Sequence, residues 1–556
     1  MTRWLVTRTN REFVSYLSRA SSVSPALAQV LINRGIKTPE AVRDFISGGA
    51  LKEPFALAGV REAVEAISSA KRAGTKVLVH GDYDVDGVSA TAIMVKALRL
   101  YGLDAGYFIP DRFRHGYGFG PHGVEAARET GAGLIITVDC GITSFEAVEL
   151  AEKHGIGVII TDHHEGAVPP SLLGEAPKVP PALAVINPRL SDPGGCNLSG
   201  AGVALKVAMG LGFPPEDFID LAALGTLADV VPLLEENRVI LKNGLALIKE
   251  GAKAGIKALK SVSGLDGRDI KAQNLSFTLL PRINAAGRIS SAGDVVELLL
   301  TESEDAASQI ASSLDRMNSE RQRIEETVYK SAMAGLEAKG AKPAIVLSGE
   351  GWHEGVIGIV ASKMAEAFSR PVFILSLKDG MAKGSARSIP GFDLHSALAG
   401  CREHLISFGG HKQAAGLRLR AEDLEAFEER IISVVQSHVS EFVPSLRVDA
   451  DIGLTEVGFG LVNELEALEP FGEGNPLPLF GSRGLEMVSP RVVGSGHLKT
   501  RLRAGGRSFD AIGFEMGGLL ETLGDTVDAV YAVTINEWEG GKTLQLNLKG
   551  LRAPAQ

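Results

Sequence analysis

The sequence contains little cysteine and no long apolar run. Its three cysteines, Cys140, Cys196 and Cys401, are far apart and never form a Cys-x-x-Cys pair, so we expect neither a disulfide framework nor a cysteine zinc site. No stretch approaches the ~18 uninterrupted apolar residues of a membrane span. The first residues, MTRWLVTRTNREF, lack the apolar core of a signal peptide. We therefore expect a cytoplasmic protein with no membrane segment.

Positive charge is also in the minority. The chain carries 57 Lys and Arg against 67 Asp and Glu, a formal charge of −10. Taken alone, this balance argues against a protein coated with positive charge for nucleic acid. Hydrophobic residues make up 45% and charged residues 22%, which excludes global disorder. A length of 556 residues exceeds one ordinary core, so two to four domains are expected.

The apolar pattern divides the chain into segments. Residues 1–50 predict a helical segment, because SPALAQVLINRG and TPEAVRDFIS each offer a Ser or Thr that can cap a helix. Over residues 51–290, short apolar runs alternate with amphipathic stretches, which is typical of βαβ units around a parallel sheet. Residues 303–338 contain one apolar stripe on a charged stretch, which predicts a long connecting helix within the segment 291–340. A coiled-coil seam and a helix that bridges two domains both fit this stripe.

The C-terminal part shows two further patterns. Residues 341–440 repeat the α/β pattern on a smaller scale, with AIVLSG, GVIGIVASKMAEAF and PVFILSL as strand, helix and strand. Residues 445–556 change to short alternating runs separated by turn residues, which predicts a small β-barrel or sandwich. The expected fold class is therefore α/β and multidomain, with a β domain at the C-terminal end.

The strongest chemical signal is the motif VHGDYDVDGVSAT. A predicted strand at residues 76–80 is followed by three carboxylates, Asp82, Asp84 and Asp86. Like charges a few ångströms apart resist ionising together, so a divalent cation is expected to neutralise them. An Asp-rich surface turn is the alternative.

The same pattern recurs at the ends of the next predicted strands. Asp139 ends GLIITVD, and Asp162, His163 and His164 end GVIITDHH. Ligands gather at the carboxyl ends of parallel strands, so we expect these side chains in one crevice. Oxygen ligands with one or two imidazoles fit Mn²⁺ or Mg²⁺, or two such ions. Asp229 in LGTLADVVPL is a further candidate ligand, because an unpaired charge in an apolar run is costly.

Two cations held by such ligands promote the attack of water on phosphorus. Two-metal aminopeptidases use similar ligands, so the residues alone do not separate phosphate chemistry from peptide chemistry.

At this point a family resemblance becomes visible. The order His80, Asp84-x-Asp86, Asp139 and Asp162-His163-His164 resembles the DHH phosphoesterase superfamily. Within it, seven motifs between residues 54 and 550 are similar to the RecJ family of single-stranded-DNA-specific 5′→3′ exonucleases: GDYDVDG, TVDCGI, TDHH, LGTLADVVPL, PRINAAGR, GWHEGVIGIVASK and FGGHKQAAG. The resemblance implies a DHH domain, a DHHA1 domain and a C-terminal OB-fold-like barrel. It also implies two-metal hydrolysis of DNA to mononucleotides, in recombination and repair.

The resemblance further implies which residues act. Two ions, Mn²⁺ or Mg²⁺, would be bound by Asp84, Asp86, Asp139, His163 and Asp229. His80 and Asp82 would lie in or beside the same cluster, although a strand-end His is often only a hydrogen-bonded cap. His164 would touch the scissile phosphate or orient the cluster.

Basic residues near these motifs are candidates for phosphate binding. They are Arg112 in a Gly-rich loop, and Arg282, Asn284 and Arg288 in PRINAAGR. An Arg between Pro, Ala and Gly has little helical face to decorate and can hold an anion in a bidentate manner. A solvated surface position is the usual alternative for a single Arg.

The second α/β segment offers Ser385 and Arg387 in GSARSIP, and Gly409, Gly410 and His411 in FGGHKQAAG. Paired glycines permit close approach of the backbone, and the Ala-rich turn after them could begin a helix that presents N–H groups to a phosphate. We expect the terminal 5′-phosphate pocket among Arg112, Arg282, Arg288, Ser385 and Arg387. Such a pocket would explain the removal of one nucleotide per cut.

In the last segment, Lys499, Arg501 and Arg503 alternate along KTRLRAG, within a stretch from Ser489 to Phe509 that has no acid. Alternation places them on one strand face, as an electrostatic track for a phosphodiester backbone would require. A solvated hairpin is the alternative.

Two other functions remain open. A phosphodiesterase for short oligonucleotides or cyclic dinucleotides usually lacks the C-terminal segment, and a non-catalytic scaffold typically loses the metal-binding acids. The resemblance also suggests single-stranded DNA with a 5′ end as substrate, and the single-stranded DNA-binding protein and a RecQ-type helicase as partners of a monomer. No residue identifies either contact.

Overall fold

The computed structural model describes residues 2–112, 114–166, 178–191, 197–289, 291–340, 342–438, 443–538 and 541–554. They form two compact units. The large unit comprises Trp4–Asn284, Ser291–Ala311 and Leu446–Gln556, and the small unit comprises Met1–Arg3, Ala285–Ser290 and Ser312–Ser445. The bounds of the five segments expected from the sequence stay predictions.

The N-terminal part contains strand β1 (Arg3–Val6) and helices α1 (Arg11–Ser21), α2 (Pro25–Asn33) and α3 (Pro39–Ser47). Ser24 caps α2 by accepting a hydrogen bond from the Leu27 N–H at 3.2 Å, and Thr38 caps α3 by accepting one from the Ala41 N–H at 3.2 Å. Both capped helices were expected, because Ser and Thr satisfy the free N–H groups of a first turn. Strand β1 was not predicted.

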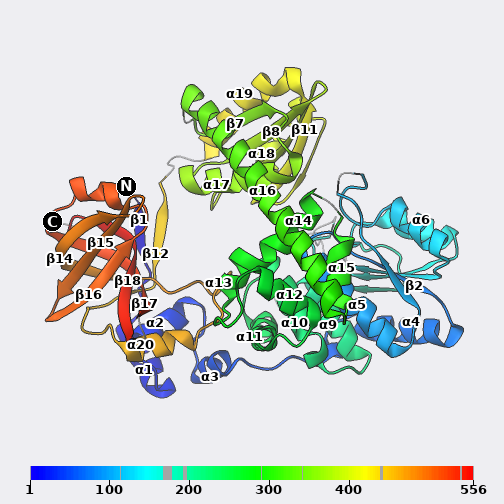
Figure 1. The fold of residues 1–556 in the computed structure, drawn as a ribbon, viewed down its shortest axis with the longest axis horizontal. Coiled ribbons are helices and arrows are strands. Elements are labelled where there is room, and N and C mark those ends of the chain that lie inside the picture. The colour runs from blue at the N-terminus through cyan, green and yellow to red at the C-terminus, as the bar shows by residue number, and fades with distance from the viewer. Residues whose placement is uncertain are drawn as a thin grey trace. The chain divides into compact units, whose positions relative to one another are not determined.

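The large unit contains a five-stranded parallel sheet, in which β2 is labelled in Figure 1. Its order is β3-β2-β4-β5-β6, with all neighbours parallel. The strands are β2 (Val77–His80), β3 (Ala105–Phe108), β4 (Leu134–Val138), β5 (Gly157–Thr161) and β6 (Ala184–Ile186). Because β2, β4 and β5 are adjacent, the motifs that follow them meet at one edge of the sheet. The predicted parallel-sheet fold is confirmed.

Helices surround this sheet and continue the chain. They are α4 (Val60–Ala73), α5 (Val85–Tyr101), α6 (Pro121–Thr130), α7 (Phe145–Lys153), α8 (Pro188–Ser191), α9 (Gly200–Gly210), α10 (Ile219–Ala228), α11 (Glu235–Glu250), α12 (Ala254–Val262), α13 (Ala272–Asn274), α14 (Leu280–Ile289) and α15 (Gly293–Leu300). A π-helical turn, η3 (Leu275–Leu279), joins α13 to α14. Helix α5 is buried on almost every side, as expected for the first crossover of a sheet that is covered on both faces.

The C-terminal strands form a closed barrel (orange to red in Figure 1). They are β13 (Ala450–Asp451), β14 (Phe480–Val493), β15 (His497–Ala504), β16 (Arg507–Gly513), β17 (Thr526–Trp538) and β18 (Gly541–Arg552). Strand β12 (Ser445–Val448) precedes them, and helix α20 (Phe459–Glu466) lies between β13 and β14. The order is β13-β14-β15-β16-β18-β17, and an additional β14–β17 pairing closes the ring. One apolar core joins barrel residues such as Phe480 and Leu546 to Leu27 of α2. The expected OB-fold-like barrel is confirmed.

The small unit contains a mixed sheet of order β10-β11-β9-β8-β7. Its strands are β7 (Ile345–Glu350), β8 (Val372–Lys378), β9 (Met381–Arg387), β10 (Ser407–Gly410) and β11 (Ala414–Arg420), and its helices are α17 (Glu354–Phe368), α18 (Leu394–Ala399) and α19 (Leu424–His438). Only β7 and β8 are parallel among these neighbours.

The long helix predicted over 303–338 is present as α16 (Glu304–Lys339), and the segment 291–340 also contains the shorter helix α15. Helix α15 ends at Leu300, Thr301 adopts an extended conformation, and α16 then runs for 36 residues. Ser303 begins the new helix by accepting a hydrogen bond from the Ala306 N–H at 3.3 Å.

The sequence led us to expect neither disulfides nor a membrane span, and both expectations can be compared with the described residues. Cys140 and Cys401 are buried free thiols, and Cys196 lies outside the described part of the chain. Within that part, no helix combines the length and the apolar character that crossing a membrane requires.

Candidate metal centre

Carboxylates and imidazoles from four segments gather at the carboxyl edge of the large unit's sheet. Three sets of side chains each hold ligand atoms within 4.8 Å of one another. The sets are Asp82, Asp84 and Asp139; Asp139, His163 and His164; and Asp86, His163 and Asp229. Because Asp139 and His163 each belong to two sets, the arrangement suits two neighbouring cations.

His163 lies at the centre of this cluster. Its Nε2 atom is 3.0 Å from Asp139 Oδ1, 3.5 Å from Asp229 Oδ2 and 3.8 Å from Asp86 Oδ2. Asp229 is the C-cap residue of α10. The C-terminal end of α10 therefore positions Asp229, the candidate ligand that lies inside an apolar run of the sequence.

Backbone amides hold the acids that follow β2. Asp84 caps α5 by accepting a hydrogen bond from the Gly87 N–H at 3.0 Å. Asp86 accepts hydrogen bonds from the N–H groups of Gly200 at 2.6 Å and Ala201 at 2.9 Å, at the start of α9. The positive end of a helix thus stabilises this buried carboxylate.

Two glycines make room for the acids. A Cβ atom on Gly225 would lie 2.3 Å from Asp86 Oδ1, and one on Gly200 would lie 2.6 Å from Asp139 Cβ. Asp139 itself has a φ of 61°. A left-handed conformation at a non-glycine residue costs energy and occurs often at functional sites, and here it directs a carboxylate into the cluster.

Asp162 orients its neighbours and belongs to none of the three sets. Its carboxylate accepts hydrogen bonds from the N–H groups of Ile142, His163 and His164 at 2.9, 2.7 and 3.1 Å. It also lies 2.7 Å from His164 Nδ1. Although burial opposes the cation, the hydrogen bond to Asp162 and its charge raise the pKa of His164 to about 9. The pKa of His164 in the metal-free protein therefore lies above neutral pH.

The buried ligand atoms lack protein partners. Asp82 Oδ1, Asp139 Oδ1 and His163 Nε2 are buried and make no hydrogen bond within the described structure. Burial, followed by repulsion from neighbouring carboxylates, raises the pKa of Asp139 and Asp82 well above the usual range, that of Asp229 to about 8 and that of Asp86 to about 6. Burial lowers the pKa of His163 to about 3, so its imidazole is neutral. Unpaired oxygens and a neutral imidazole are the donors that Mn²⁺ and Mg²⁺ require, so the residues fit such ions.

His80 is not among the three metal-ligand sets of the described residues. Its ring packs against Phe108 and Phe119, with centroids 5.5 and 5.1 Å apart, and its Nδ1 is 3.7 Å from Cys140 Sγ. Its buried Nε2 makes no hydrogen bond within the described residues, so the expectation that His80 lies in or beside the metal cluster stays a prediction.

Sequence reasoning missed the contribution of the segment after β6. Arg189 Nε donates to the His163 carbonyl at 2.7 Å, and Asn187 Nδ2 donates to the His164 carbonyl at 2.9 Å. Tyr117 Oη lies 3.1 Å from His164 Nε2. The Asn-Pro-Arg sequence follows a strand end as the acidic motifs do, so the same strand-end argument, extended to one more strand, would have found it.

The phosphate-binding candidates of the large unit lie on a loop and a helix. The Arg112 guanidinium lies 5.3 Å from the centroid of the Tyr83 ring. The argument that PRINAAGR offers little helical face was wrong, because Arg282 and Asn284 lie on α14. The Arg282 guanidinium donates to the Thr278 carbonyl at 2.5 Å. Alanine is the strongest helix former, so the two alanines of the motif favour a helix, and its single interior glycine weakens the helix by only about 1 kcal/mol.

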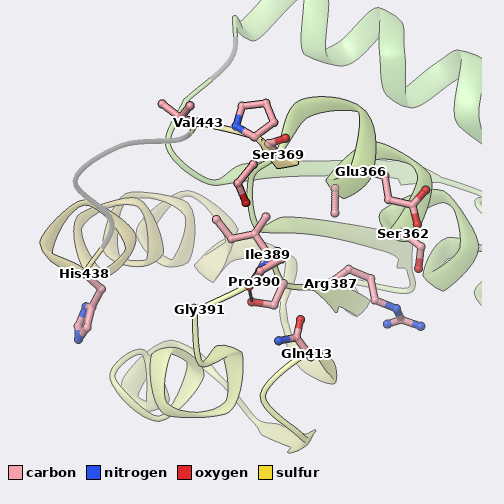
Figure 2. Close-up of a pocket in the computed structure, with 14 residues that line it drawn as sticks. Ser362, Glu366, Ser369, Arg387, Ile389, Pro390, Gly391, Gln413, His438 and Val443 are labelled. Atoms are coloured by element: carbon pink, nitrogen blue, oxygen red, sulfur yellow. Dashed lines mark hydrogen bonds between the residues drawn. The ribbon is translucent and has the colours of Figure 1, made fainter. Parts of the chain in front are cut away.

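The small unit holds the remaining candidates around α17 and β9. Arg288 Nη1 donates to the Gly355 carbonyl at 3.0 Å, and Arg387 Nη1 donates to Ser385 Oγ at 3.0 Å. Arg387 lines a cavity of about 650 Å³, and Figure 2 shows it with Ser362 and Gln413 around that cavity.

The helix expected after Gly409 and Gly410 is absent from the described residues. These glycines end β10, His411 lies in the turn, and β11 follows as a hairpin partner, with Gly410 opposite Ala415. The alternation in AGLRLR, which buries every second residue of β11, explains why this segment is a strand.

The basic residues of the barrel share one face of β15, as predicted. Lys499, Arg501 and Arg503 alternate with buried residues. Neighbouring strands nevertheless supply acids that the sequence stretch lacks. Arg501 Nε donates to Asp510 Oδ1 at 3.0 Å, and Arg503 Nε donates to Glu486 Oε2 at 2.8 Å. The positive track is therefore weaker than the sequence suggested.

Comparison with known proteins agrees with this geometry. Three family models match the chain: the DHH family N-terminal domain at residues 76–226, the DHHA1 domain at 341–437 and the RecJ OB domain at 448–550. Together with the metal-ligand cluster, they define a metal-dependent phosphoesterase of the DHH class.

Full-length relatives narrow this class. The chain is 36% identical over 564 residues to the single-stranded-DNA-specific exonuclease RecJ of Bacillus subtilis, covering 98% of this chain and 70% of the relative. The crystal structure of Thermus thermophilus RecJ in complex with Mn²⁺ matches with a TM-score of 0.87 at 33% identity, covering 100% of this chain and 80% of that one. The Mg²⁺ complex of the Thermus protein matches with a TM-score of 0.81 at 31% identity, covering 100% and 79%. The chain belongs to the RecJ family.

Proposed function

We propose that this protein is a single-stranded-DNA-specific 5′→3′ exonuclease that releases mononucleotides and acts in DNA recombination and repair. The observation that carries the proposal is the cluster around His163 and Asp139, whose buried ligand atoms have no protein partner. Relatives named for this activity, at 36% identity over almost the whole chain, support it.

The chain's own residues supply the sites for two Mn²⁺ or Mg²⁺ ions. Asp82, Asp84, Asp86, Asp139, His163 and Asp229 provide the oxygen and nitrogen donors. When bound, the ions supply the Lewis acidity that activates water and neutralises a phosphodiester. His164, held as a cation by Asp162, is placed to donate a hydrogen bond to an oxygen of the scissile phosphate.

Phosphate binding outside the metal centre is assigned to two sets of residues. In the large unit, Arg112 and Arg282 are the candidates, and in the small unit Ser385 and Arg387 form a hydrogen-bonded Ser–Arg pair that can bind a phosphate. A terminal 5′-phosphate at such a site would fix the strand relative to the cut. The expected monomeric state, the cytoplasmic location and the two expected partners stay predictions.

Digestion of a single strand labelled at either end tests the function. With Mn²⁺ or Mg²⁺, a 5′ label is expected to appear at once in mononucleotides, whereas a 3′ label stays in a shortening strand. EDTA should abolish both, and a duplex of the same sequence should resist. Early release of the 3′ label, or equal activity in EDTA, would contradict the proposal. Asp84→Ala is the matched inactive control.

A further inference from the structure

A groove of about 350 Å³ begins beside the metal ligand Asp229. Three segments of the large unit line it: the end of α10 with the loop after it, the turn η3, and residues 471–477 before the barrel. Consecutive Cα atoms are ~3.8 Å apart, so Val230, which lines the groove, directly adjoins the metal centre.

Two apolar side chains in this groove are unusually exposed. Phe277 is 83% exposed and Val230 is 64% exposed. Phe277 lies in the π-helical turn η3, whereas its neighbours Leu275 and Leu279 are buried. A π-turn changes the direction of the side chains that follow it and is frequent at functional sites. Here it presents an aromatic ring to solvent at the groove.

Val230 is also strained. Its φ is 58°, a conformation that β-branched residues rarely adopt. Strain of this kind persists where the surrounding structure fixes it, and it is concentrated at binding sites. The strained residue and the exposed ring therefore lie in the same groove, next to the metal ligand.

The two sides of the groove are joined rigidly. The Leu233 N–H donates to the Glu473 carbonyl at 2.8 Å, and a Cβ atom on Gly472 would lie 2.5 Å from Leu233 Cδ1. The segment that leads to the barrel is thus packed directly onto the loop after Asp229. The groove is a formed feature of the large unit.

The lining favours an uncharged, flat ligand. Glu473 is the one ionisable residue among those that line the groove within the described chain. A surface without Lys or Arg does not attract phosphates or an acidic peptide. Nucleobases, in contrast, have a π-face that stacks on aromatic side chains regardless of sequence, and Gln273 and Ser276 offer hydrogen bonds at the edge.

We propose that this groove binds the nucleobase on the 3′ side of the scissile phosphate, with the Phe277 ring as its stacking platform and Val230 as the opposing apolar contact. The proposal rests on the proposed exonuclease function. The 3′ side is assigned because the groove runs from Asp229 to the segment that precedes the barrel, where the uncut strand would continue.

Phe277→Ala tests the platform. Affinity for a 5′-phosphorylated single strand is measured in EDTA, so that the strand stays intact. Loss of one base stack is expected to weaken binding about tenfold, and Phe277→Trp should retain wild-type affinity. Tyr16→Ala is the control, because Tyr16 is an aromatic residue of α1 that is 53% exposed and does not line the groove.

An abasic scan identifies the base. A single abasic nucleotide is moved along the strand, and in the wild type one position should weaken binding about as much as Phe277→Ala. The variant should be insensitive at that position, and 2-aminopurine placed there should be quenched by the wild type alone. Cleavage of the intact strand by the wild type with Mn²⁺ is measured in parallel, and its absence would defeat the proposed function itself. If the wild type cleaves the strand but Phe277→Ala binds it and quenches 2-aminopurine as the wild type does, only this inference is overturned. The groove would then be a site for an apolar protein segment.

Discussion

His163 Nε2 lies 3.0 Å from Asp139 Oδ1, and neither atom makes a hydrogen bond. Two buried polar atoms that face each other without a hydrogen bond are costly, since each has lost its water. The contact is relieved when cations take both lone pairs. The residues around it therefore define a centre whose stability and activity depend together on metal.

Asp139→Ala is expected to remove activity and metal binding at both positions, because Asp139 belongs to two ligand sets. Isothermal titration with Mn²⁺ in the absence of DNA measures the binding. Asp229→Ala, which belongs to one set, should leave one ion bound. Two ions bound by Asp139→Ala would contradict the shared ligand.

Asp162→Asn should weaken Mn²⁺ binding by about 10–100-fold, the usual effect of removing a residue that orients a ligand. It should also lower the pKa of His164, whose raised value of about 9 depends on Asp162. NMR titration of the His164 ring reports this shift. A purely structural role would change the melting temperature and leave the His164 pKa where it was.

The melting temperature of the metal-free protein should fall as pH rises from about 6.5 to about 8. The pKa of Asp229 is raised to about 8 and that of His164 to about 9, so the folded protein binds more protons than the unfolded chain over this range. Stability then decreases with pH. His163, whose folded pKa is about 3 against 6.5 unfolded, acts in the opposite direction only below pH 6.5.

Mn²⁺ competes with these protons, so its stabilising shift should be larger at pH 8 than at pH 6.5. Differential scanning calorimetry in EDTA and in Mn²⁺ measures both trends. Asp229→Asn removes one of the titrating groups and should flatten the curve. An increase of metal-free stability over the same range would be the contrary result.

Val230→Gly should keep or slightly raise the melting temperature while it weakens binding of single-stranded DNA. A left-handed conformation costs a β-branched residue ~1–2 kcal/mol, and the 64% exposed side chain contributes little packing. Glycine relieves the strain and removes the apolar contact. Thermal unfolding reports the relief of strain, and DNA binding in EDTA reports the loss of the apolar contact. A clear fall in the melting temperature of Val230→Gly would contradict the expected relief of strain.

Lys499→Ala should reduce DNA affinity and lower the salt slope of binding by about one. Arg503→Ala should reduce the DNA affinity and the salt slope by smaller amounts, because Glu486 already neutralises Arg503 through a hydrogen bond of 2.8 Å. Among the described residues, Lys499 has no ion-pair partner. Binding measured at several salt concentrations distinguishes the two variants, and equal slopes would refute the difference.

The sequence was sufficient for the metal centre because its residues follow strand ends. Asp84, Asp139 and His163 are each placed by the strand that precedes them, and adjacent parallel strands bring these positions together. The same local logic predicted the caps Ser24 and Thr38.

What the sequence could not provide depends on neighbours distant in the chain. The Gly200 amide that binds Asp86 is 114 residues away, and Glu486, which neutralises Arg503, is on another strand. The packing of the His80 ring against Phe108 and Phe119 is a contact of the same kind, which the local sequence does not show. Pairing between strands and packing of side chains are tertiary contacts, which a local sequence pattern does not determine.

The two glycines beside the acids show that this centre is shaped as much by missing atoms as by ligands. A single methyl group at Gly225 would occupy the space of Asp86 Oδ1, and one at Gly200 would displace Asp139. Alanine at either position would therefore silence the enzyme with every ligand still in place. Inheritance of all six proposed metal-binding side chains is thus no guarantee of an active nuclease.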